Sequence, residues 1–221
     1  MSRQIKNIIA ITLFLICIGL INVAGQNIEI EIRGINAFTF ILIIAVLLQV
    51  IFFIPSFLLK TEKYFDIVGS LTYIITISIA YFSVENKTMI DSIIYFYVMV
   101  WASRLGIYLF RRVRNDGKDI RFEKAKRHFF WFLQYWMGQA LWVSLTACAA
   151  IIAILSPEDN TLPVFAIIGM ALWLSGFSIE SVSDYQKRVF RKENNPSESF
   201  IRTGLWAVSY THLTLPTRLM V

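Results

Sequence analysis

The sequence predicts an all-α, polytopic membrane helical bundle with about six transmembrane helices and both termini in the cytoplasm. The 221 residues are 57% hydrophobic and only 16% charged, whereas soluble domains carry roughly 25% charged residues. The apolar residues come in blocks near the length of about 20 residues that a helix needs to cross a bilayer core. Basic residues gather in alternate connections between these blocks, which is the pattern that orients membrane helices.

Six apolar blocks can be drawn, over residues 8–24, 38–59, 67–82, 93–110, 131–155 and 162–179. The first follows Arg3 and Lys6 in the manner of a signal peptide. Because no A-x-A-type cleavage site follows it, we interpret it as a retained helix. The third and sixth blocks are short, so helix tilt or local bilayer thinning is expected there.

Charge along the connections alternates in sign. Basic residues cluster at positions 3–6, 60–63, 111–127 and 187–202. The segment 111–127 is expected to be a long cytoplasmic loop. The remaining connections are dominated by acids, namely Glu29, Glu31, Glu85, Asp91, Glu158 and Asp159. The net charge of +6 is therefore explained by topology and by attraction to anionic headgroups. We expect membrane lipids as partners and no nucleic acid.

Cysteine and histidine give no indication of a metal centre. Cys17 and Cys148 both fall inside predicted spans, where a lone thiol normally packs as a small apolar group. The chain has only two histidines, His128 and His212. No metal site is predicted.

Ionisable residues inside or beside a span indicate where a site could form. Arg104 lies within the fourth span, and Trp101, Tyr108 and the pair at 111–112 recur at spacings of three and four, so they share one helix face. This face suits a pocket wall, although an arginine near a helix end also reaches the headgroups by extending along the span. Asp66 opens the third span, where an acid can bind substrate or cap the helix N-terminus.

A second charged stripe follows the sixth span. Glu180, Asp184, Arg188 and Arg191 lie on one side of a predicted helix that continues to about residue 192. This pattern is found on any charged helix that leaves a bilayer. It also suits a nucleotide, because carboxylates accept hydrogen bonds from ribose hydroxyls and arginines make bidentate contacts with phosphates.

A resemblance to a known family favours the nucleotide interpretation. The segment 180–192 reads ESVSDYQKRVFRK and is followed by Asn195 and by Gly-Leu-Trp at 204–206. It resembles the cofactor segment of the steroid 5-alpha-reductase-like membrane family, and most closely its bacterial branch of unknown substrate. The motif W-x-x-R-L-G-x-Y at 101–108 and Gln139-Ala140 fit the same branch. The resemblance covers about residues 66–209.

The resemblance implies an integral membrane oxidoreductase of a bacterial inner membrane, which reduces a carbon–carbon double bond of a lipid-like unsaturated substrate with NADPH from the cytoplasmic side. Family cofactor contacts fall on Glu180, Asp184, Arg188, Arg191 and Asn195. Substrate contacts are expected from Asp66, Trp101, Arg104 and Tyr108. Trp101 stands where the steroid enzymes have their carbonyl-binding tyrosine, which leaves Tyr108 as the candidate catalytic residue and argues against a steroid substrate.

The resemblance also bears on the ends of the domain. Residues 1–209 are expected to form a single membrane domain, and residues 210–221 resemble a translated sequencing-adapter tail rather than native sequence. The family continues after Gly-Leu-Trp with an Arg-His-Pro-Asn-Tyr-type segment, so the chain is expected to be an incomplete reductase that is inactive alone.

Two other functions remain open from the sequence. The prenylcysteine carboxyl methyltransferases share this architecture and a similar C-terminal motif, so an S-adenosylmethionine-dependent membrane methyltransferase is the first alternative. The second is a non-catalytic membrane protein, which would need an aqueous path lined by paired charges.

Overall fold

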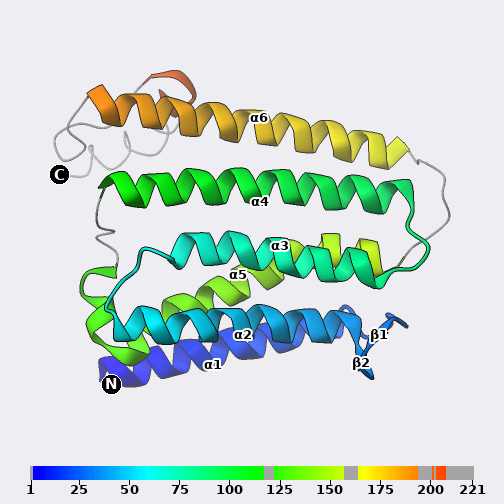
Figure 1. The fold of residues 1–221 in the computed structure, drawn as a ribbon, viewed down its shortest axis with the longest axis horizontal. Coiled ribbons are helices and arrows are strands. Elements are labelled where there is room, and N and C mark those ends of the chain that lie inside the picture. The colour runs from blue at the N-terminus through cyan, green and yellow to red at the C-terminus, as the bar shows by residue number, and fades with distance from the viewer. Residues whose placement is uncertain (1, 117–121, 157–163, 194–200, 202, 208–221) are drawn as a thin grey trace, which may run out of the picture. The chain divides into compact units, whose positions relative to one another are not determined.

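The structure is a computed structural model that describes residues 2–116, 122–156, 164–193, 201 and 203–207. It divides into two compact units, residues 1–160 and residues 161–221. Six helices in the described ranges are long and apolar enough to cross a membrane, and Figure 1 labels them. They are α1 (Arg3–Val23), α2 (Ala37–Leu58), α3 (Phe65–Ser83), α4 (Met89–Asp116), α5 (Phe129–Leu155) and α6 (Val164–Glu193). The predicted all-helical fold with six long apolar helices is confirmed.

The helix ends differ from the predicted spans where charged residues extend a helix beyond its apolar block. Helix α4 continues through Asp116, so the first six residues of the segment 111–127, which we expected to be a loop, are helical. Arginine is a good helix former, and its long side chain places its charge at the headgroups while the backbone stays in the helix. Helix α6 likewise continues to Glu193, close to the predicted end at residue 192.

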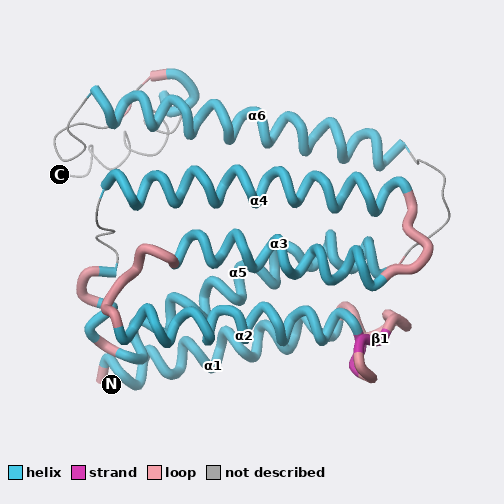
Figure 2. The backbone as a smooth tube through the Cα atoms, viewed as in Figure 1, coloured by secondary structure: helices cyan, strands magenta, loops and turns pink. Residues whose placement is uncertain are grey.

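A small β-hairpin that the sequence analysis did not anticipate joins α1 to α2. Strands β1 (Glu31–Ile32) and β2 (Ile35–Asn36) pair antiparallel, and Figure 2 shows this segment between the helices. Arg33 and Gly34 both have positive φ, at 53° and 77°, as a two-residue type I′ turn requires. The Asn36 side chain then accepts a hydrogen bond from the Thr39 N–H at 3.1 Å and caps α2.

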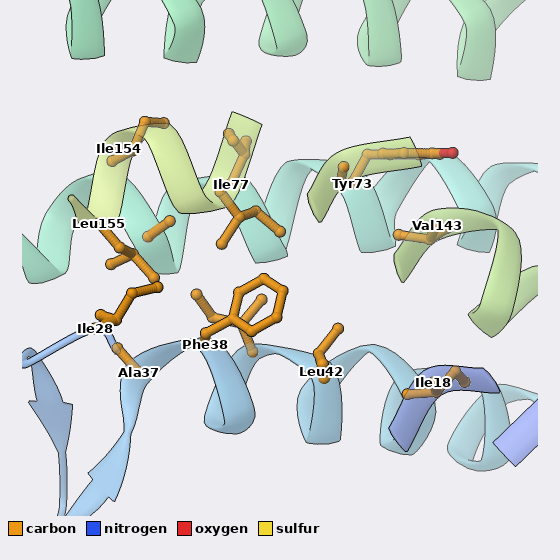
Figure 3. Packing of buried hydrophobic residues seen from close by; sticks show 14 of the residues in the cluster. Ile18, Ile28, Ala37, Phe38, Leu42, Tyr73, Ile77, Val143, Ile154 and Leu155 are labelled. Carbon is orange, nitrogen blue, oxygen red and sulfur yellow. The ribbon is translucent and has the colours of Figure 1, made fainter. Parts of the chain in front are cut away.

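Helix α5 is central to the first unit, because it packs against α1, α2 and α3, while α4 packs mainly on α3. Figure 1 shows that α1 to α4 run in alternating directions and that α5 begins at the same end of the unit as α1. The main core lies between these helices and the hairpin, with Phe38, Ile77 and Ile154 fully buried. Figure 3 shows Phe38 of α2 and Ile77 of α3 facing one another, with Leu155 of α5 beside them.

A second core lies at the other end of the first unit and is mainly aromatic. It contains Phe53, Phe65, Phe122, Phe132 and Trp136, together with Val68, Ala125 and Met137. The basic segments at the start of α1, before α3 and before α5 all belong to this end, since Arg3 lies over Trp131 and Lys126 pairs with Glu62. One end of the unit therefore collects these basic connections, and its cytoplasmic orientation stays a prediction from the charge pattern.

Candidate functional site

Two of the residues predicted to bind substrate, Asp66 of α3 and Trp101 of α4, lie at the interface between these two helices. Arg112 of α4 donates a hydrogen bond from Nη2 to the Asp66 carboxylate at 3.1 Å, and the two side chains are 26% and 12% exposed. Asp66 lies in the first turn of α3 but is not its cap, because the helix begins after Tyr64, which makes no capping hydrogen bond. Asp66 is therefore not the N-cap residue, but its carboxylate lies in the first turn, where negative charge is favourable at a helix N-terminus. Asp66 also joins two helices at one end of the unit.

The same interface closes tightly one turn further along. A Cβ atom at Gly106 would lie 2.8 Å from the Ser70 Cβ, so α3 and α4 approach so closely that a side chain at this position would clash. Small residues at helix contacts allow such close approach in membranes. This close approach lies between the Asp66–Arg112 ion pair and the contact of Tyr73 with Trp101, and it fixes the distance between the two helices there.

Trp101 packs edge-on against Tyr73, with ring centroids 5.0 Å apart and planes at 83°. The Tyr73 hydroxyl is hydrogen-bonded to the Thr146 hydroxyl of α5. Thr146 donates its single hydrogen to the Trp142 carbonyl at 2.7 Å, so Tyr73 is the donor in this pair. The sequence analysis did not identify Tyr73. Its ring lies beside the Trp101 indole, so the two residues form an aromatic contact between α3 and α4.

Arg104 and Tyr108 lie on α4 between Trp101 and Arg112. Tyr108 is seven residues from Trp101 and four from Arg112, so these three side chains follow one stripe of the helix, and Arg104 is rotated from it by about 60°. Both Arg104 and Tyr108 are partly buried. The structure therefore places Asp66 and Trp101 in contacts between α3 and α4 and the other two predicted residues between these contacts on α4.

Buried polar side chains lie beside this interface, between α2, α3 and α5. Gln49 and Thr72 are fully buried and joined by a hydrogen bond of 2.9 Å from Gln49 Nε2 to Thr72 Oγ1. The amide of Gln139 occupies the space that a side chain at Gly69 would fill. Within the described residues, Gln49 Oε1, Gln139 Oε1, Trp136 Nε1 and Ser144 Oγ are buried without a hydrogen-bond partner. These atoms leave unused hydrogen-bonding capacity inside a membrane domain, where such capacity is costly.

The predicted cofactor residues of the second unit lie along one side of α6. Glu180, Asp184, Arg188 and Arg191 are separated by four, four and three residues within the helix, which keeps them on one stripe. Arg188 lies 5.4 Å from the Tyr185 ring centroid. Along this face, two carboxylates that can accept hydrogen bonds from ribose hydroxyls are followed by two guanidinium groups that can donate to phosphates.

The segment after α6 folds back on the helix beside this stripe. The short 3-10 helix η3 (Gly204–Trp206) is held by two hydrogen bonds, from Leu205 N to Gln186 Oε1 at 3.0 Å and from Trp206 Nε1 to the Ser183 carbonyl at 3.1 Å. The Lys187 ammonium also lies 4.9 Å from the Trp206 ring centroid. The Gly-Leu-Trp motif therefore contacts the same two turns of α6 that carry Asp184 and Arg188.

Gly204 is required at the start of this fold-back. Its φ of 63° lies in the left-handed region, and a Cβ there would be 2.5 Å from Gln186 Oε1. Asn195 and residues 210–221, about which the sequence made predictions, lie outside the described residues.

An ion pair that the sequence analysis missed holds the connection before α5. Lys126 Nζ donates to Glu62 Oε2 at 2.7 Å, and the Glu62 side chain is only 5% exposed. Lys126 belongs to the 3-10 helix η2 (Ala125–Arg127). No local pattern could have revealed this contact, because the two residues are 64 positions apart.

Six apolar helices, charged residues at the helix ends and polar atoms buried between helices define an integral membrane protein that crosses the bilayer several times. Residues 52–212 match the family DUF1295, described as a protein of unknown function. The chain belongs to this family, which is related to the membrane families of the steroid 5-alpha-reductases and the prenylcysteine carboxyl methyltransferases. No match was found among curated proteins or among solved structures.

Proposed function

We propose that the protein is an integral membrane reductase, which uses NADPH to reduce a carbon–carbon double bond of a lipid-like unsaturated substrate. The observation that carries this proposal is the stripe of two acids and two arginines on α6, with the Gly-Leu-Trp segment folded against the same turns. The stripe lies on the side of the bilayer that the charge pattern predicts to be cytoplasmic. Membership of DUF1295 supports the proposal through the related reductase family.

Each residue of the stripe has a role that follows from its chemistry. Arg188 and Arg191 would hold the phosphates, because a guanidinium makes paired hydrogen bonds with phosphate oxygens. Asp184 and Glu180 would accept hydrogen bonds from ribose hydroxyls. NADPH, when bound, supplies the hydride. The Lys187 ammonium beside the Trp206 ring would add positive charge next to the phosphates.

The substrate would lie along the α3–α4 interface of the first unit. Trp101 and Tyr73 form an aromatic wall there, and Arg104 and Tyr108 follow on the same helix. An indole N–H or a guanidinium can donate a hydrogen bond to a substrate carbonyl and so stabilise negative charge that develops on its oxygen. The membrane-embedded position favours an apolar substrate and excludes water. Tyr108 remains the candidate proton donor, because the Tyr73 hydroxyl already donates its single hydrogen to Thr146.

The first test is nucleotide binding by the purified full-length protein, held in detergent or nanodiscs. We expect NADPH to raise the melting temperature and Arg191→Ala to weaken binding by about 10- to 100-fold, the range for one lost charge-assisted hydrogen bond. The matched control is Lys124→Ala, because Lys124 is exposed. Lys126 is unsuitable as a control because it pairs with the buried Glu62. Equal binding by the Arg191 and Lys124 variants would contradict the proposal.

The same preparation separates the two related enzyme classes. S-adenosylmethionine and NADPH are compared at equal concentration for stabilisation of the unvaried protein. Stabilisation by NADPH, together with oxidation of NADPH when an α,β-unsaturated lipid ketone is added, supports the reductase. Stabilisation by S-adenosylmethionine alone would replace the proposal with a methyltransferase.

A further inference from the structure

A cavity of about 380 Å³ lies where the start of α1 meets the start of α5 in the first unit. Figure 1 shows these two helices beginning at the same end. The side chains that give the cavity its character are Arg3, Asn7, Arg127, His128 and Trp131. None of them belongs to the interface or stripe described above, and the inference does not depend on the proposed reductase activity.

The cavity is basic and carries no acid. Arg3 and Arg127 come from different elements, α1 and η2, and no aspartate or glutamate is among the lining residues. Neither arginine has an ion-pair partner among the residues that the structure describes. Two guanidinium groups at one cavity without a carboxylate favour an anionic ligand.

Arg3 is held in a position that leaves its donors available. Its guanidinium carbon lies 4.4 Å from the centroid of the Trp131 ring, and the His128 ring stacks near the same indole, at 6.0 Å and 25°. Stacking uses the face of the guanidinium and leaves the N–H groups at its edge for hydrogen bonds. Trp131 therefore positions a cation at the mouth of the cavity.

Asn7 gives the second, independent indication of a ligand. Its side chain lines the cavity, is only 9% exposed, and makes no hydrogen bond with any described residue. The Asn7 amide is not among the polar atoms that are sealed from solvent without a partner, so it is available to a ligand in the cavity. In addition, α5 begins at the cavity without a side-chain cap, so the N–H groups of its first turn remain available to an anion.

The surroundings of the cavity are those of a lipid. Ile5, Ile8 and Ile9 of α1 and Phe129 and Phe130 of α5 are exposed hydrophobic residues, so the cavity opens beside surfaces that face acyl chains. Arginine with aromatic residues at the end of a transmembrane helix marks the depth of the headgroups.

A second cavity, of about 390 Å³, shares Trp131 with the first and continues along α5 past Gln134 and Gly138. Its lining also includes Phe14 and Phe65. The first cavity carries two arginines and the second carries none, and both border Trp131, which suits a molecule with a charged head and an apolar body.

We propose that the cavity at the start of α1 and α5 binds the phosphate of an anionic phospholipid headgroup, with Arg3, Arg127 and Asn7 as its ligands and the adjoining cavity taking the apolar part. The bound lipid would fix the N-terminal end of α1 to α5. Phosphate is the recognised group, so inorganic phosphate is the alternative source that the test must separate.

The test is native mass spectrometry of the purified full chain in detergent, titrated with phosphatidylglycerol or with phosphatidylcholine. We expect a one-to-one adduct with phosphatidylglycerol that is at least about tenfold tighter than with phosphatidylcholine. Arg3→Ala combined with Arg127→Ala should weaken it by about 30-fold, which corresponds to about fivefold for each arginine near an anionic lipid. The control, Lys60→Ala combined with Lys63→Ala, removes two charges from the same end of the unit outside the cavity and should change binding less than twofold.

A second variant tests the same cavity in case the double arginine variant does not fold. Asn7→Leu keeps a side chain of similar size on α1 but removes the amide, so lipid binding should fall by about fivefold or more while the melting temperature in neutral lipid is maintained. Binding that is equal in the arginine variant and the control overturns the proposal, as does equal affinity for the two lipids. Loss of the adduct in millimolar inorganic phosphate would also overturn it, because the site would then recognise the free anion.

Discussion

The hydrogen bond between Gln49 and Thr72 offers a direct measure of polar packing inside the first unit. Both side chains are fully buried, and Gln49 Nε2 donates to Thr72 Oγ1 at 2.9 Å. Gln49 Oε1 already lacks a partner among the described residues. Thr72→Val keeps the shape of the side chain but removes the acceptor, so the whole Gln49 amide would be left unsatisfied.

The expected cost of Thr72→Val is about 1–2 kcal/mol of unfolding free energy, because a buried amide donor loses its only partner. Gln49→Leu should be nearly neutral or slightly stabilising, since it also removes the unpaired oxygen and conserves the volume of the side chain. In the Gln49→Leu background, Thr72→Val should therefore cost little. The coupling energy should be about 1 kcal/mol, which lies between the average of about 0.6 kcal/mol and the maximum of about 1.7 kcal/mol found between membrane helices.

The assay is reversible unfolding in mixed micelles with increasing sodium dodecyl sulfate, followed by tryptophan fluorescence, for the four proteins of the cycle. Thr76→Val is the matched control, because Thr76 is also buried but donates only to the main-chain carbonyls of Thr72 and Tyr73. Its effect should be the same with glutamine or leucine at position 49. A coupling energy near zero, or a Gln49→Leu variant less stable than Thr72→Val, would refute the reasoning.

Three further substitutions test other contacts. Gly106→Ala places a methyl group 2.8 Å from the Ser70 Cβ, so α3 and α4 must separate and the unfolding free energy should fall by about 1–3 kcal/mol in the same assay. Gly204→Ala combines a φ of 63° with a clash at Gln186 and should cost about 1–2 kcal/mol locally, seen as faster proteolysis after α6. Phe122→Ala empties a site that is 1% exposed and should cost about 3–5 kcal/mol, measured by unfolding.

Each of these has a control within the chain. Gly19→Ala meets nothing within 4 Å, so it should not lower stability as Gly106→Ala does. Gly34→Ala adds the strain of a positive φ of 77° without a clash and should be milder than Gly204→Ala. Phe96 is 61% exposed, so Phe96→Ala should leave the unfolding free energy nearly unchanged. A variant that behaves like its control would show that the corresponding contact is unimportant.

The transmembrane helices could be predicted from the sequence because each apolar block is local and its length is set by the bilayer. The stripe on α6 could be predicted for the same reason, since helical periodicity places Glu180 and Arg191 on one side without knowledge of the fold. The extension of α4 to Asp116 was missed because the first charged residues after the apolar block were taken to mark the end of the helix. Arginine is a good helix former, so a segment rich in arginine can continue as helix.

Contacts between distant residues could not be predicted. Lys126 and Glu62 meet only because η2 returns to the start of α3. Tyr73 reaches Trp101 only because α3 and α4 approach closely at Gly106. The hairpin was missed because its strands have two residues each, too few to show an alternating pattern. The roles predicted for Trp101, Arg104, Tyr108 and the α6 residues stay predictions, as does the single membrane domain over residues 1–209.

The central position of α5 has a consequence for how the protein is made. Helices α1, α2 and α3 all pack against α5, yet α5 ends only at Leu155. During synthesis, the earlier spans must therefore enter the bilayer before their common partner exists. Until then, the buried amide of Gln49 and the aromatic rings of Phe53 and Phe65 face lipid or the insertion machinery. Ribosome stalling, or a membrane chaperone that delays release of the first four spans, would affect the period before α5 is inserted. Mutations in α5 should reduce the yield of protein, because the first four spans would then be exposed to proteolysis.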